Sequence, residues 1–135
     1  MKLLATVPDA ERIVIDYLTA ALAARSQDVT VGVNVPLTWT AGTKPHVQVG
    51  WDGTPVVSYP VVARASVRVT CWHASTTTAK AMAALCEGLL LSHPGGPGVA
   101  SVKSLTGVLP TRDPDTGAQL AMIAVEVRLT YTVLA

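Results

Sequence analysis

The sequence contains no phenylalanine and few charged residues. Of its 135 residues, 14% are Asp, Glu, Lys or Arg and 50% are apolar, and the mean hydropathy is +0.42. Disordered proteins are more charged and less apolar than this, so we expect the chain to fold. Because the apolar residues are mainly Val, Ala and Leu, they favour a β-rich sheet with closely packed helices. They also leave apolar surface for self-association.

The chain also lacks a surplus of charge of either sign. Ten basic and nine acidic residues give a net charge of +1, so there is no overall field to neutralise phosphates and we expect any DNA contact to be local. No uncharged apolar run approaches the ~20 residues of a membrane span. The opening MKLLATVPDAERIV lacks the apolar core of a signal peptide. We therefore expect a soluble protein made in a cytoplasm, with no membrane partner.

Only two cysteines occur, and both lie in VTCWHASTTTAKAMAALC, residues 69–86. Zinc needs about four ligands, whereas Cys71, His73 and Cys86 offer one C-x-H pair and a later cysteine. All three fall on inward-facing positions of the pattern. We favour buried, idle thiols, with two alternatives left open: a reactive Cys71 assisted by His73, and a metal site. No cofactor or metal is expected.

The length predicts a single domain over residues 1–135. A helix is predicted in TVPDAERIVIDYLTAALAARSQ, with Thr6 as N-cap and Pro8 in the first turn. Alternation of apolar and polar residues predicts strands at 29–39 and 46–51, which suggest a hairpin or the start of a meander. A third strand is predicted at 61–73.

The second half of the chain predicts one more helix and two strands. Ser75 or Thr76 is expected to cap the helix, and the residues from His93 to Gly95 to end it. A strand at 99–109 and a long strand at 120–134, the expected spine of the sheet, are joined by LPTRDPDTGAQ. The predicted class is α+β: a mostly antiparallel β-sheet of about five strands with two helices packed on one face, in the order α-β-β-β-α-β-β.

Two charged strand segments provide the first candidate functional residues. Arg64 and Arg68 share one face of a strand, and Glu126 and Arg128 share a face of another that we expect to lie alongside it. One interpretation is a solvated face with cross-strand pairs. The other is a polar wall that lines a pore or a subunit contact.

Two loops provide further candidates for partner contacts. The segment DGTPVVSYP carries Val56, Val57 and Tyr59, which either form an interface or, the favoured interpretation, fold back on the core. Asp113 and Asp115 shape the later loop, with weak cation binding as a minor alternative. No constellation typical of an enzyme is found, so we expect no enzymatic activity. His46, which follows Pro45 in a turn, is expected to face solvent.

Several stretches together resemble a known family. They are the PDAERIVIDYL helix, the strands VTVGVNVPLTW and PHVQVGW, the strand RASVRVTCWHAS leading into the helix AKAMAALCEGLL, and the final hairpin PTRDPDTGAQLAMIAVEVRLTYTV. In element order and local character the chain is similar to tail terminator proteins of long-tailed bacteriophages, especially those infecting actinobacteria. The likeness spans nearly the whole chain. Related head-to-tail joining and tail completion proteins share it.

This resemblance implies an α+β protomer that forms a ring, usually a hexamer, at the head-proximal end of the tail in the virion, assembled in the host cytoplasm. The ring would cap the tail tube protein, meet the head connector or stopper protein, and let genomic DNA pass without sequence specificity. The family has no shared active-site residues, so Arg64, Arg68, Arg128 and Glu126 are candidates for the lumen or a subunit interface. A tail tube subunit, another neck protein, and a small thiol enzyme using Cys71 and His73 remain the alternatives.

Overall fold

The computed structural model describes residues 3–134, which form two helices and eight strands. In chain order these are β1 (Ala5–Thr6), α1 (Ala10–Ala24), β2 (Thr30–Gly32), β3 (His46–Trp51), β4 (Val56–Ser58), β5 (Val62–Trp72), α2 (Thr76–Leu91), β6 (Val99–Arg112), β7 (Gln119–Thr130) and β8 (Thr132–Val133). The mostly antiparallel α+β class predicted from the sequence is confirmed.

The main sheet has the strand order β2-β3-β5-β7-β6, and β4 pairs with β5 beside this path. The five strands of this path correspond to the five strands predicted from the sequence. β5 and β7 are paired without interruption from Val62 opposite Thr130 to Trp72 opposite Leu120. The central strand is therefore β5, and the expected spine, β7, lies next to it. A separate two-stranded sheet joins β1 to β8 near the two ends of the described chain.

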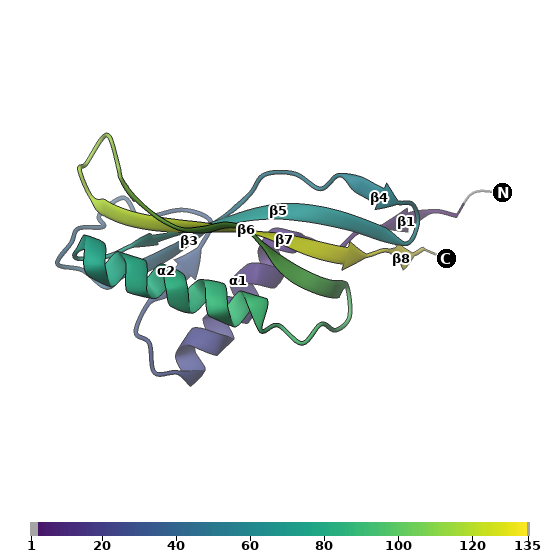
Figure 1. The fold of residues 1–135 in the computed structure, drawn as a ribbon, viewed down its shortest axis with the longest axis horizontal. Helices are drawn as coiled ribbons and strands as arrows, with labels where there is room; N and C mark the ends of the chain where they lie inside the picture. The colour runs from purple at the N-terminus through teal and green to yellow at the C-terminus, as the bar shows by residue number, and fades with distance from the viewer. Residues whose placement is uncertain (1–2, 135) are drawn as a thin grey trace.

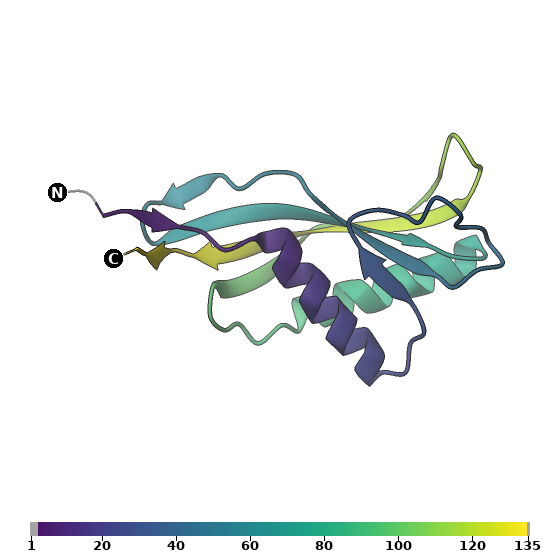
Figure 2. The same cartoon turned by 180° about the vertical axis from the view of Figure 1, so that it is seen from behind.

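Both helices cover the same face of the sheet, which Figures 1 and 2 show from opposite sides. α1 packs over β2, β3 and β5, and α2 packs over β5, β6 and β7. Val14, Leu18 and Leu22 of α1 are buried, and α2 contributes small residues such as Ala79 and Ala83. Each fully buried Leu or Val favours the fold by about 1.5–3 kcal/mol relative to exposure. No helix within residues 3–134 is long and apolar enough to cross a membrane.

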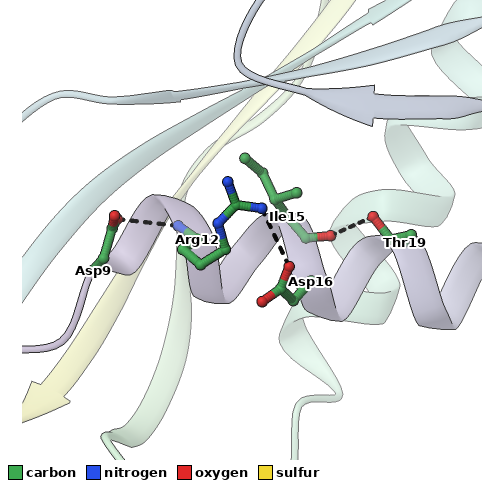
Figure 3. Close-up of polar contacts among 5 residues, drawn as sticks. All are labelled: Asp9, Arg12, Ile15, Asp16 and Thr19. Carbon is green, nitrogen blue, oxygen red and sulfur yellow. Dashed lines mark hydrogen bonds and ion pairs between the residues drawn. The ribbon is translucent and has the colours of Figure 1, made fainter.

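The first helix starts later than the sequence predicts, because its N-cap is Asp9 and not Thr6. The Asp9 carboxylate accepts a hydrogen bond from the backbone N–H of Arg12 at 3.1 Å (Figure 3). Thr6 instead pairs with Thr132 in the small sheet. One N-cap side chain is enough to accept from a free N–H group in the first turn. Because Thr6 is held in the small sheet, Asp9 takes this role. Figure 3 also shows the exposed side of α1, where Arg12 and Asp16 form an ion pair one turn apart.

The second helix begins as predicted, at Ser75. Its hydroxyl accepts from the backbone N–H of Thr78 at 3.2 Å, and the Thr78 hydroxyl accepts from the N–H of Ser75 at 3.1 Å. This reciprocal capping satisfies two N–H groups that the helix itself leaves free. The expected ending also holds, since Leu91 is the last helical residue and Gly95 follows at φ +80°, where glycine is favoured.

Two predicted strands are shorter than expected. Of residues 29–39 only Thr30–Gly32 is strand, and it runs parallel to β3, so the expected hairpin is wrong. A parallel pair needs a crossover, and residues 33–45 supply it, with Pro36 unable to donate to a ladder. The last strand ends at Thr130 because the chain after Tyr131 pairs with β1 instead.

Candidate functional site: the helix-free face of the sheet

The face of the sheet that carries no helix holds the charged residues that the sequence singles out. Side chains alternate across a strand, so burial of Ala65, Val67 and Val69 under the helices turns their neighbours to the other side. Arg64 and Arg68 of β5 are among these neighbours, and Arg128 lies opposite Arg64 on β7. We call this surface the helix-free face.

Arg64, Glu126 and Arg128 form one charge cluster, as the alignment of the two strands predicts. Oε1 of Glu126 lies 3.7 Å from Nη1 of Arg64, and Oε2 lies 3.6 Å from Nε of Arg128. The Glu126 side chain is only 14% exposed, whereas that of Arg64 is 53% exposed. Lys103 on β6 lies opposite Glu126 on the other side. One carboxylate therefore lies between two guanidinium groups, with a third cation next to it, and offsets only part of their positive charge.

Arg68 does not join this cluster. Its Nη2 lies 3.1 Å from Oδ1 of Asp52, which directly follows β3. Asp52 is not evident from the local sequence pattern, because only the antiparallel register that sets Gly50 opposite Arg68 brings this residue near. Both side chains are about half exposed, and such pairs contribute about 0–1 kcal/mol to stability. The pairing thus matters more for the charge of the surface than for the fold.

One end of the helix-free face is covered by the crossover between β2 and β3. The ring of Trp39 in this segment meets Trp72 edge-on at 5.5 Å, and Nε1 of Trp72 donates to Gln48 at 3.2 Å. The charged cluster lies beyond this cover, further along β5. Uncovered polar surface is therefore concentrated on the middle of β5 and β7.

His46 lies under the same cover, so the expectation that it faces solvent is wrong. It is only 3% exposed, and its Nδ1 lies 2.6 Å from the hydroxyl of Thr30. Burial lowers the pKa of His46, and the nearby backbone of Asn34 acts in the opposite direction. The parallel pairing of β2, which the local pattern did not reveal, places Thr30 opposite His46.

The cysteines lie in the core, as favoured from the sequence. Cys71 and Cys86 are both free thiols with no exposed surface. The neighbouring Cys86 thiol and burial raise the pKa of Cys71 well above its usual range, which disfavours the thiolate. His73 departs from the predicted inward register, because β5 ends at Trp72 and His73 is half-buried. Among the described residues, no three His, Cys, Asp or Glu side chains gather in a way that could hold a metal ion.

The two candidate loops differ from each other in character. Val56, Val57 and Tyr59 are between 47% and 58% exposed, so the favoured interpretation that they fold back on the core is wrong.

Asp113 closes its turn by accepting from the backbone N–H and the hydroxyl of Thr116, and these bonds lower its pKa. Asp115 is exposed in the same turn. This second loop is a turn between β6 and β7 that its own side-chain hydrogen bonds hold in place.

Comparison with known proteins does not assign the chain to a family. No protein-family model matches the chain, and a search of curated proteins finds no significant match. Function is therefore inferred from the arrangement of the residues.

Proposed function

We propose that the chain is a structural subunit of a bacteriophage tail, a terminator protein whose ring caps the tail tube and meets the head connector. The observation that carries this proposal is the two-sidedness of the sheet. One face is sealed by both helices. The other presents a partly charge-compensated Arg64–Glu126–Arg128 cluster without a helix over it. A polar face backed by a rigid core is suited to line a channel.

The charge of this face also supports the proposal. DNA passing through a ring needs a polar lining that does not hold it, because many unpaired Lys and Arg side chains would bind phosphates tightly. Glu126 pairs with both Arg64 and Arg128, and Asp52 pairs with Arg68, so two carboxylates offset part of the charge of three arginines. With a net charge of +1, the chain as a whole has no strong overall attraction to DNA.

The thiol enzyme is the weaker alternative. A nucleophilic cysteine must be accessible and able to ionise, whereas Cys71 is fully buried and its pKa is raised. A tail tube subunit or another neck protein shares the features that support the terminator, and assembly behaviour separates them.

Electron microscopy of the purified chain, alone and mixed with tail tubes from a long-tailed phage of an actinobacterial host, tests the proposal. We expect closed rings of uniform diameter, or rings that form only at tube ends. Open polymerisation into long tubes would assign the chain to the tube itself. A protein that stays monomeric and leaves tube ends bare would overturn the tail assignment.

A further inference from the structure

One tip of the molecule is built almost entirely from apolar residues. It consists of residues 3–6, 56–61 and 131–134, which we call the apolar tip. Figure 1 shows β1, β4 and β8 together at this end, with the loop between β6 and β7 at the opposite end. The tip carries eight large apolar side chains from Leu3 to Leu134 that are 45% to 65% exposed. None of its residues is charged.

The apolar tip is held together by specific contacts. The Tyr59 hydroxyl donates to the carbonyl of Leu3 at 2.7 Å and accepts from the N–H of Ala5 at 3.0 Å. The N–H of Leu134 donates to the carbonyl of Leu4 at 2.8 Å. The rings of Tyr59 and Tyr131 meet edge-on at 5.1 Å. β1, β4 and β8 are therefore joined to one another and hold the tip in a defined arrangement.

Strand β4 shows that this surface is incomplete within one chain. A strand at the edge of a domain normally turns one face to the core and one to water. In β4, however, Val56, Val57 and Ser58 are all exposed, although successive side chains point to opposite faces. Both faces of the strand thus present a valine to solvent, which the core of this chain does not cover.

The area of the tip is in the range of a protein interface. Eight half-exposed residues at roughly 90 Å² each together expose on the order of 700 Å². The largest apolar patch on a typical monomer is about 300–600 Å², and a stable interface buries about 800 Å² on each partner. Summed over both faces of β4, the exposed apolar area of the tip thus approaches that of one side of a protein interface.

We propose that the apolar tip packs against a second copy of this chain. An uncharged surface provides no attraction for nucleic acid and lacks the basic residues that typically accompany binding at a lipid surface. Another copy supplies uncharged Val and Leu side chains and needs no complementary charge. The proposed ring already requires self-association, and this inference adds the surface that mediates it. An oligomer that Val57→Lys leaves intact would overturn the role of the apolar tip and leave the proposed ring standing.

Sedimentation velocity of the full chain and of Val57→Lys over a wide concentration range tests the proposal. Val57 is exposed, so the substitution leaves the core intact, and unchanged circular dichroism checks this. We expect the full chain to sediment as an oligomer and Val57→Lys to shift to the 14.0 kDa monomer. The matched control is Leu37→Lys, at a fully exposed position in the crossover between β2 and β3, away from the apolar tip. We expect this variant to remain an oligomer.

Labelling of an introduced thiol provides an independent measurement. Both native cysteines are buried, so Val57→Cys and Leu37→Cys each carry one accessible thiol. We expect maleimide to label Cys at position 57 more slowly as protein concentration rises, and position 37 at a constant rate. A monomeric full chain, or equal behaviour at both positions, would overturn the proposal. So would binding of the full chain, but not of Val57→Lys, to phosphatidylcholine vesicles without self-association.

Discussion

His46 shows how one residue links stability to pH. It is the only polar or charged residue among those described that falls in the buried class. Thr30 holds its Nδ1, while its Nε2 is buried without a hydrogen-bond partner. The nearby charged pair, Lys44 with Asp28, is satisfied within itself at 3.0 Å. Protonation would add a charge to a ring that water does not reach, so the fold favours neutral imidazole.

Acidification should therefore weaken the fold through His46. Because the folded pKa lies below the ordinary value of 6.5, the unfolded state binds the proton first. The free energy of unfolding is then highest above pH ~6.5 and falls as the pH drops below it. We expect His46→Asn, whose amide can replace Nδ1, to flatten this decline in urea unfolding curves.

His73 provides the matched control for this experiment. Its pKa is also lowered by burial, but it is only half-buried. His73→Asn should flatten the decline less than His46→Asn does. If His46→Asn leaves the acid-side slope of the unfolding free energy unchanged, the buried neutral imidazole is not what makes the protein sensitive to acid.

At the scale of elements, α2 depends on its first turn. The helix has no acidic residue there to interact with the helix dipole. The reciprocal hydrogen bonds of Ser75 and Thr78 are therefore the main local features that define where the helix begins. They also fix the junction with β5, whose last buried residue is Cys71.

Loss of this cap should lower stability measurably. We expect Ser75→Ala to reduce the free energy of unfolding by about 1 kcal/mol, the usual cost of removing an N-cap hydroxyl. Thr77→Ala changes an exposed hydroxyl in the same turn and serves as control, with a change close to zero. Equal effects of the two substitutions in chemical denaturation would show that the cap is not the determinant.

At the scale of the whole molecule, the distribution of charge over the two sides of the sheet matters more than any single pair. Glu126 pairs with Arg64 and Arg128 on the helix-free face. Asp16 pairs with Arg12 on the opposite side, on the exposed surface of α1. Neutralising either carboxylate changes the net charge equally but alters different surfaces.

If the helix-free face meets DNA, these two substitutions should differ in their effect. We expect Glu126→Gln to bind duplex DNA more tightly, with a salt dependence of log K steeper by about 1 for each freed guanidinium that contacts phosphate. Asp16→Asn should stay close to the unmodified chain. Fluorescence anisotropy across a salt series measures both. Identical salt slopes for the two variants would argue against contact of DNA with this face.

The features that depend on local pattern followed from the sequence alone. Alternation over 61–73 and 120–134 predicted which side chains of β5 and β7 share a face, because the pleat of a strand leaves no other choice. The Ser75 cap and the buried positions of Cys71 and Cys86 followed in the same way, from the switch between strand and helix periodicity.

Tertiary structure decided everything that depends on distant partners. The parallel direction of β2 buried His46, the register of β3 brought Asp52 to Arg68, and pairing of β1 with β8 moved the start of α1 to Asp9. The same pairing, together with the hydrogen bonds of Tyr59 to Leu3 and Ala5, gathered the apolar tip from three separate segments. Local periodicity specifies the face on which a side chain lies. It carries no information on which strand will lie beside it, because that choice is made by packing and hydrogen bonds between segments far apart in the chain.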